Sequence, residues 1–308
     1  MLAVVDIVDS IRSLGDIFGF PAPKLYGRYL VSLWYKIQKV AIPQLVALDL
    51  DGTSLNEHRE LAPETVEAIL RAHDSGLHII FASGRMALSV ETFSKPLGIP
   101  IHIVSSNGGY VESSDGREIY HATLRESVAH WAVSYSERNA LHLQGYRRRQ
   151  AMSLSDGPFY DLYVSRVKGV QPEIVSTEGF LSGSLTKVLF LDHPNVLDDH
   201  EAAFHDLLSP ESVHIVRSEP DYLELLPPHV NKSVGLSALL KELGFEMREL
   251  AAIGDYLNDY EMLIDAGFSG AVANAHPKIL ESVDLVVPSN VEAGVARFLD
   301  EIIRKRGQ

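Results

Sequence analysis

The 308-residue sequence contains no cysteine. Disulfides, thiolate catalysis and cysteine-based zinc or iron–sulfur sites are therefore excluded. No apolar run approaches the roughly eighteen residues of a membrane-spanning helix, and the formal net charge of −14 argues against sequence-independent nucleic-acid binding. What is present, 46% hydrophobic and 22% charged residues, is typical of an ordinary soluble globular protein.

A secretory signal pattern is also missing from the beginning of the sequence. The first basic residue, Arg12, comes after Asp6 and Asp9, whereas a signal peptide carries its basic residues before its apolar stretch. The absence of cysteine is in keeping with a reducing compartment. We therefore expect a cytoplasmic protein.

Short apolar runs alternate with helical patterns from about residue 43 onward. The run 45–50 precedes a helical stretch that has Pro63 near its start and Gly76 at its end. The same alternation continues through the apolar runs 78–84 and 101–109, the helical stretch 86–97, and a run that closes on Asp255. This pattern predicts an α/β fold with a parallel, Rossmann-like sheet covered by helices on both faces.

The middle of the sequence follows another pattern. A helix is predicted after Thr123, which has the capping-box spacing to Glu126. It is followed by strand-like runs at 141–149, 159–167 and 185–192, a helix over 194–209, and paired runs at 213–218 and 222–227. We expect an inserted α+β cap domain at about 113–220, between two core segments at 43–112 and 221–308.

Residues 1–42 form a third segment, an N-terminal extension. Between residues 24 and 39, apolar side chains such as Leu30 and Trp34 share one helical face, and basic ones such as Arg28 and Lys36 lie on the other. A membrane-surface anchor is one interpretation of this amphipathic helix. Packing of its apolar face on the core or on a second subunit is the interpretation that we favour.

Two aspartates, Asp49 and Asp51, follow the first apolar run, in "DLDGT". Their side chains leave the same face of the strand end, and ligands bind beyond the carboxyl ends of parallel strands. Isolated buried carboxylates are costly, so the pair needs a metal, a cation or a chemical task. A turn dipeptide or a calcium loop are alternatives, but no loop of the right length ending in glutamate follows.

A second acidic cluster follows a later apolar run, in "GDYLND". Asp255 closes that run, and Asn258 and Asp259 open the next helix, where they could also act as helix caps. If both strand ends meet, four carboxylates converge and repel each other. Oxygen ligands of this kind suit Mg²⁺.

Anion-binding elements accompany the carboxylates. Ser83 ends an apolar run, and Gly84 and Arg85 enter the next helix, which is an arrangement suited to a phosphate. Asn231 is a predicted helix cap, with Lys232 in the first helical turn. A lysine there opposes the helix dipole, which indicates a functional role. Taken alone, the residues around Arg85 or Lys232 could also be ordinary surface residues without a function.

In this order, "DLDGT", "SGR", Lys232 and "GDYLND" resemble the four motifs of the haloacid dehalogenase (HAD) superfamily. The match covers roughly residues 43–308 and is most similar to the Cof-type phosphatases with a large α/β cap. The resemblance implies a phosphatase that hydrolyses small phosphate monoesters, such as sugar phosphates or the phosphorylated cofactors FMN and PLP. It also implies that the reaction passes through an aspartyl-phosphate.

The resemblance implies a role for each motif residue. Asp49 would be the nucleophile and Asp51 the general acid and base. The implied Mg²⁺ ligands are Asp49, the main-chain carbonyl of Asp51, Asp255 and, in support, Asp259. The implied phosphate-binding groups are the N–H groups of Leu50 and Gly84, together with Ser83, Lys232 and Asn258. Arg85 and Asn107 are weaker candidates, near the leaving group or supporting the loop.

Two rival functions remain at this stage. A phosphomutase also uses two aspartates at this spacing but passes the phosphoryl group to a sugar, and it would depend on a bisphosphate activator. A non-catalytic phospho-acceptor switch needs an acceptor aspartate and a lysine, but no acid two residues later. Asp51 and the large insertion count against the switch.

Overall fold

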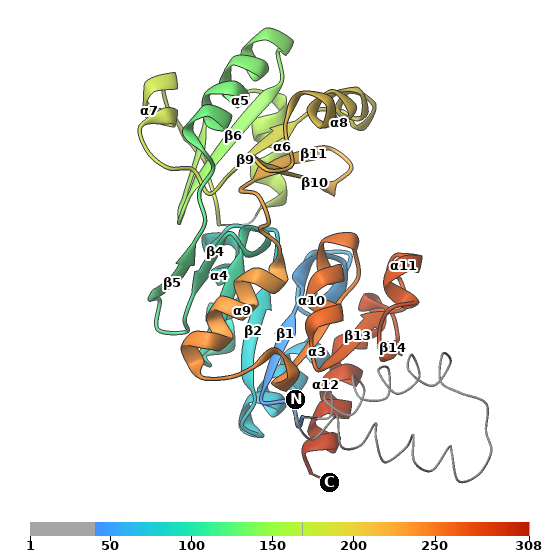
Figure 1. Cartoon of the computed structure of the whole chain (residues 1–308). Coiled ribbons are helices and arrows are strands. Elements are labelled where there is room, and N and C mark those ends of the chain that lie inside the picture. The colour runs from blue at the N-terminus through green and yellow to red at the C-terminus, as the bar shows by residue number, and fades with distance from the viewer. Residues whose placement is uncertain (1–40, 168, 308) are drawn as a thin grey trace, which may run out of the picture. The chain divides into compact units, whose positions relative to one another are not determined.

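The computed structural model describes residues 41–167 and 169–307. Two sheets, one of eight strands and one of six, lie in the unit Ile42–Gln308 (Figure 1). The predicted amphipathic helix between residues 24 and 39 falls outside the described residues. Within residues 41–167 and 169–307, no helix combines the length and the apolar character needed to cross a membrane.

The eight-stranded sheet is the core sheet, and its six strands from β14 to β3 run parallel. In spatial order the strands are β14 (Leu285–Val287), β13 (Phe268–Val272), β12 (Leu250–Gly254), β1 (Leu45–Leu48), β2 (His78–Ala82), β3 (Ile101–Ser105), β4 (Tyr110–Glu112) and β5 (Glu118–His121). Strand β1 lies between β12 and β2, and its four residues are buried. The predicted parallel α/β core is therefore confirmed.

Helices cover the core sheet, and short helical turns join them to the strands. The helices are α3 (Pro63–Asp74), α4 (Ala87–Ser94), α9 (Lys232–Leu243), α10 (Tyr260–Asp265), α11 (Pro277–Leu280) and α12 (Gly294–Arg306). The turns are η1 (Leu50–Ser54), η2 (Lys95–Leu97), η3 (Ser106–Gly108), η4 (Met247–Glu249), η5 (Leu257–Asp259) and η6 (Asn290–Glu292). Helix α3 contacts α12, and α9 contacts α10 in front of the sheet as Figure 1 draws it. Their apolar faces enclose one hydrophobic core.

The six-stranded sheet is the cap sheet. In spatial order its strands are β10 (His214–Glu219), β11 (Tyr222–Leu226), β9 (Lys187–Leu191), β6 (His142–Arg147), β7 (Gln150–Ser153) and β8 (Glu173–Ile174). All neighbours pair antiparallel except β7 with β8. The cap helices are α5 (Glu126–Asn139), α6 (Pro158–Arg166), α7 (Thr177–Leu181) and α8 (Pro194–Leu207). The sheet and helices together are the α+β insertion that the sequence predicts.

Two local predictions for the insertion are wrong. Helix α5 begins at Glu126 with Arg125 as its N-cap, and it has no side-chain capping bond. The predicted capping box fails because the N–H of Leu124 donates to the carbonyl oxygen of Leu185, which holds the preceding chain in an extended conformation. The run 159–167 forms helix α6 instead of a strand, starting at Pro158 in the first helical turn.

Sheet membership also moves both expected boundaries of the insertion. Strand β5 belongs to the core sheet, so the chain enters the cap after His121 and not at residue 113. Strand β11 belongs to the cap sheet, so the chain returns to the core after Leu226 and not at residue 220. The short strands β4 and β5 were missed because each offers only three or four residues of pattern.

Candidate active site

The two aspartates of the first motif lie just beyond the carboxyl end of β1. The N–H of Asp49 still donates to the carbonyl oxygen of Ile253 on β12, at 3.1 Å. Gly52 then takes a positive φ of 79°, and a Cβ there would fall on the carboxylate of Asp255. The turn therefore requires glycine, because only glycine permits this φ and this close approach of the two strand ends.

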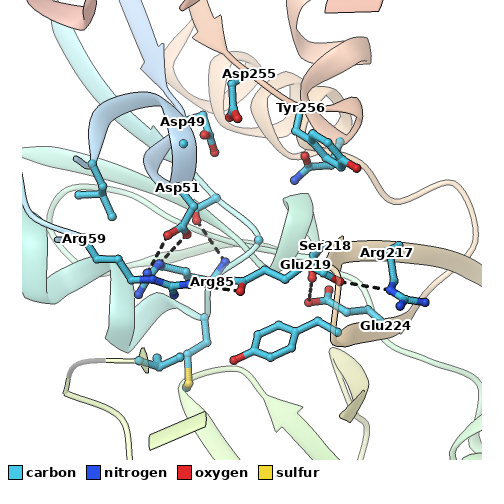
Figure 2. A pocket seen from close by; sticks show the side chains of 18 of the residues that line it. Asp49, Asp51, Arg59, Arg85, Arg217, Ser218, Glu219, Glu224, Asp255 and Tyr256 are labelled. Carbon is cyan, nitrogen blue, oxygen red and sulfur yellow. Dashed lines mark hydrogen bonds and ion pairs between the residues drawn. The ribbon is translucent and has the colours of Figure 1, made fainter. Parts of the chain in front are cut away.

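Three carboxylates meet at this point. Asp49, Asp255 and Asp259 each offer an oxygen, and these oxygens lie within 4.8 Å of one another. One oxygen of Asp49, Oδ2, is buried and has no hydrogen-bond partner. Figure 2 shows Asp49 and Asp255 close together. A buried, unpartnered carboxylate oxygen beside two other carboxylates fits a divalent cation with oxygen ligands.

Lys232 brings a positive charge to the three carboxylates. Its Nζ lies 2.6 Å from Asp49 Oδ1 and 2.5 Å from Asp259 Oδ1, and its side chain is fully buried. Burial would lower the pKa of Lys232, but the charges of Asp259 and Asp49 outweigh it, so its pKa is raised. Lys232 is thus a cation at the first position of α9, directly after the capping residue Asn231, as the sequence predicts.

Burial raises the pKa of two carboxyl groups of the cluster. The pKa of Asp49 is raised well above its ordinary value, first by burial and then by the charge of Asp259. The pKa of Asp255 is raised to about 7 by burial and by the charge of Asp259, although Thr53 Oγ1 donates to Asp255 at 2.8 Å. In both groups burial and the neighbouring charge of Asp259 outweigh the opposing effect of Lys232.

Asp51 points away from the other three carboxylates. Its two oxygens accept hydrogen bonds from Nε and Nη2 of Arg85, both at 2.7 Å (Figure 2). Arg85 also donates to Ser89 Oγ at 3.1 Å and lies over the ring of Phe93. The structure therefore brings together three of the four carboxylates expected to converge, and it pairs the fourth with an arginine.

The predicted phosphate-binding residues surround the same strand ends. Ser83 follows β2 and is fully buried, Gly84 is next to it, and Asn258 lies in η5 after β12. Leu50 is buried in η1. The amide of Asn258 donates to Asn107 Oδ1 at 3.0 Å, which joins the loops after β12 and β3.

Two charged cap residues complete the surroundings, and sequence reasoning missed both. Lys187 on β9 donates to the carbonyl oxygen of Gly84 at 2.9 Å and to Glu224 Oε1 at 2.8 Å. Glu224 on β11 also accepts from Asn107 Nδ2 at 3.3 Å. The missed signal was a single charge inside each apolar strand run, since buried charges are rare unless they are paired.

A pocket of about 530 Å³ lies between the core strand ends and the cap sheet. Its core side includes Asp49, Asp51, Ser83, Arg85, Asp255 and Asn258, and its cap side includes Tyr146, Tyr163, Lys187, Tyr222 and Glu224. A substrate in this pocket would reach the carboxylate cluster with one end and the cap with the other. The arrangement can place a reacting phosphoryl group against Asp49 and its leaving group against the cap.

Comparisons with known proteins agree with this architecture. The family model for haloacid dehalogenase-like hydrolases matches residues 46–299. Phosphatase YwpJ of Bacillus subtilis is 28% identical over 284 residues, which cover 84% of this chain and 100% of YwpJ. HMP-PP phosphatase of Escherichia coli K12 is 27% identical over 242 residues, which cover 77% of this chain and 86% of that protein.

Solved structures agree as well. A haloacid dehalogenase-like hydrolase from Bacteroides thetaiotaomicron superimposes with a TM-score of 0.76 at 27% identity, covering 84% of this chain and 99% of that one. The residues matched by the family model, 46–299, include the cap sheet, the carboxylate cluster and all of the core sheet except Leu45. The chain therefore belongs to the haloacid dehalogenase-like hydrolases and is a phosphatase of their Cof-type branch.

Proposed function

We propose that this protein is a Mg²⁺-dependent phosphatase that hydrolyses small phosphate monoesters through an aspartyl-phosphate on Asp49. The observation that carries the proposal is the unpartnered Oδ2 of Asp49, buried at the strand end, with Lys232 2.6 Å from the other oxygen. Lys232 fixes the carboxylate, and Asp49 lines the pocket. This is the arrangement that a carboxylate nucleophile requires.

In the first proposed step, a carboxylate oxygen of Asp49 attacks phosphorus and the bond from phosphorus to the leaving oxygen breaks. Asp51, in its acid form, gives its proton to that oxygen, so the product leaves as an alcohol. Because Asp51 is paired with Arg85 in this structure, it must exchange this partner for the leaving oxygen.

In the second step, water attacks the phosphorus of the aspartyl-phosphate. Asp51 takes a proton from the water, the bond between Asp49 and phosphorus breaks, and inorganic phosphate leaves. Both aspartates are then ready for another cycle. The same residue serves as acid and then as base, which is the reason why it must lie beside the scissile bond.

The metal and phosphate sites follow from the same cluster. Asp49, the main-chain carbonyl of Asp51 and Asp255 would hold Mg²⁺, with Asp259 in support. When bound, the cation offsets the carboxylate charge that would otherwise repel a phosphate dianion. Ser83, Lys232, Asn258 and the N–H groups of Leu50 and Gly84 would bind the phosphoryl oxygens, with Arg85 and Asn107 nearby. The cytoplasmic location expected from the sequence stays a prediction.

The test is phosphate release from a panel of small phosphate monoesters, measured with and without Mg²⁺. We expect release that depends on Mg²⁺ and that falls by about 10³-fold or more in Asp49→Asn. Asp300→Asn, an exposed carboxylate paired with Arg71, is the matched control and should retain activity. Full activity in Asp49→Asn would refute the nucleophile assignment. Phosphate transfer to a sugar that requires a bisphosphate would favour the mutase instead.

A further inference from the structure

The cap sheet presents two chemically different faces because side chains alternate along its strands. Residues that face the cap helices α5 and α8 are apolar and pack in one hydrophobic cluster, which includes Leu143, Val188, Phe190, Leu223 and Leu225. Residues at the intervening positions line the pocket, namely Tyr146, Lys187, Leu189, Tyr222 and Glu224. The cap side of the pocket, which we call the wall, is therefore the second face of the cap sheet.

Most of this wall is apolar and aromatic. Tyr146, Tyr163 and Tyr222 form a row of rings with centroids 6.4 Å apart at each step. They belong to a separate hydrophobic cluster, of which Met86, Val167 and Leu189 also line the pocket. Met86 comes from the core and the others from the cap. Lys187 lies over the ring of Tyr146, and Arg166 lies over the ring of Tyr222. The rest of these rings and the apolar side chains form a lining against which a flat apolar group packs well.

The cations that line the pocket are all paired with carboxylates within the described residues. Arg85 binds Asp51 at 2.7 Å, and Lys187 lies 2.8 Å from Glu224. Arg59 lies 3.2 Å from Glu219. Arg217 pairs with Glu201 at 3.0 Å and Asp198 at 3.2 Å. Figure 2 shows Arg59, Arg85 and Arg217 around the same space.

The cap side of the pocket has no surplus of positive charge. It carries Lys187 and Arg217 against Glu219 and Glu224. One phosphoryl group is provided for by the metal site and Lys232. A second anionic group on the substrate could bind a lining cation only by displacing the carboxylate that is paired with that cation. The displaced carboxylate would then be left unpaired, which is unfavourable.

We propose that the cap half of the pocket takes an uncharged leaving group with a flat apolar face, such as a neutral aromatic or heteroaromatic ring. Leaving groups with a second anionic group, among them bisphosphates and carboxylated alcohols, are discriminated against. This substrate class rests on the proposed phosphatase function. It narrows the range of small phosphate monoesters that the fold and the carboxylate cluster alone would allow.

The test uses the full chain with Mg²⁺ and three esters, which are benzyl phosphate, 4-carboxybenzyl phosphate and glycerol 1-phosphate. We expect kcat/KM for benzyl phosphate to exceed that for each of the other two by about tenfold or more. Equal values, or a preference for the carboxylated ester or for glycerol 1-phosphate, would overturn the inference while leaving the phosphatase intact. No release from any ester would overturn both.

Two kinds of variant connect the preference to the wall. Tyr222→Leu, and independently Tyr163→Leu, should lower the ratio of benzyl to glycerol ester by about tenfold, because each removes an aromatic face. Glu224→Gln leaves Lys187 without its carboxylate partner, so it should raise the ratio of carboxybenzyl to benzyl ester. Because each ratio compares kcat/KM for two esters with the same variant, an effect of the substitution on phosphoryl transfer itself cancels.

The control for Glu224→Gln is Glu242→Gln, which removes a carboxylate from an exposed ion pair with Arg117 outside the pocket. It should leave all three kcat/KM values unchanged. Circular dichroism of each variant checks the fold. An unchanged ratio of benzyl to glycerol ester in folded Tyr163→Leu and Tyr222→Leu would refute the role of the aromatic rings. An unchanged ratio of carboxybenzyl to benzyl ester in folded Glu224→Gln would refute the role of the paired cation.

Discussion

At the scale of single residues, the loop after β3 shows how backbone conformation places a functional side chain. Ser106, Asn107 and Gly108 all have positive φ, of 51°, 53° and 91°. This conformation is rare for residues with a Cβ, and it turns the amide of Asn107 into the space between Asn258 and Glu224. Asn107 thus joins the core loop that carries Asn258 to the cap strand that carries Glu224.

Gly108→Ala should destabilise the protein strongly. An added Cβ would fall on the carbonyl oxygen of Asn231, and the φ of Gly108 also disfavours any other residue. We expect the free energy of unfolding to fall by about 3 kcal/mol, measured by urea unfolding. Gly116→Ala is the control, because φ is 83° but the space around it is open. If both variants lost the same stability, the steric explanation would fail.

The residues of the site differ in how far the sequence could reveal them. Asp49, Asp255 and Lys232 stand in short motifs at strand ends or helix starts, where the local chemistry is visible. Lys187 and Glu224 stand inside strands, and their partners are distant in sequence, so only the pairing of β9 with β11 brings them together. Which strands pair depends on the tertiary fold, so the local pattern of the sequence could not predict that Lys187 and Glu224 meet.

At the scale of elements, the same distinction applies. The helix that starts at Pro63 and the helix capped by Asn231 were predicted from local signals, and Asn231 Oδ1 does accept from the N–H of Val234 at 2.9 Å. The capping box at Thr123 had the right residues, but backbone bonding around Leu124 overrode it. Helix α6 was missed because its aromatic and β-branched residues also favour strands.

Two strands contain buried histidines that should make stability depend on pH. Burial lowers the pKa of His102 on β3 to about 4, with a smaller effect from His78, and burial lowers the pKa of His142 on β6 to about 4. The ordinary value is 6.5. As pH falls below 6.5, the unfolded chain therefore binds protons before the folded one does. The free energy of unfolding should fall between pH 6.5 and about 4.

At pH 5, each of these histidines should cost about 2 kcal/mol relative to pH 7. Urea unfolding at both pH values would measure this loss, and His102→Gln and His142→Gln should each reduce it. His58→Gln, which replaces an exposed histidine, should not. A pH dependence that stayed the same in all three variants would show that other groups control it.

At the scale of the whole molecule, residues Ile42–Gln308 form a unit with its own core. The first described contacts of this unit lie close to its start. The guanidinium of Arg306 donates to the carbonyl oxygen of Pro43 at 2.5 Å and to Gln44 Oε1 at 3.1 Å. The N–H of Gln44 donates to the carbonyl oxygen of Glu249 at 2.8 Å.

A chain shortened to begin at Ile42 retains these contacts and the core of the unit, so it should fold and should still release phosphate. A chain that begins at Leu45 is the control. It lacks Pro43 and Gln44, so its midpoint should fall by a few degrees, on the order of 1 kcal/mol of stability. If the chain that begins at Ile42 aggregates, or unfolds at a lower temperature than the full chain, the unit depends on residues before Ile42.

The chain order of the core has a consequence for synthesis on the ribosome. Thr53 binds Asp255 across 202 residues of sequence, and Asp49 meets Lys232 across 183. The whole cap is translated between them, and its own strands can pair before the last core strands emerge. Domains tend to fold as units during translation. Asp49 therefore gains its lysine and its neighbouring carboxylates only near the end of translation, and a prematurely terminated chain lacks this cluster.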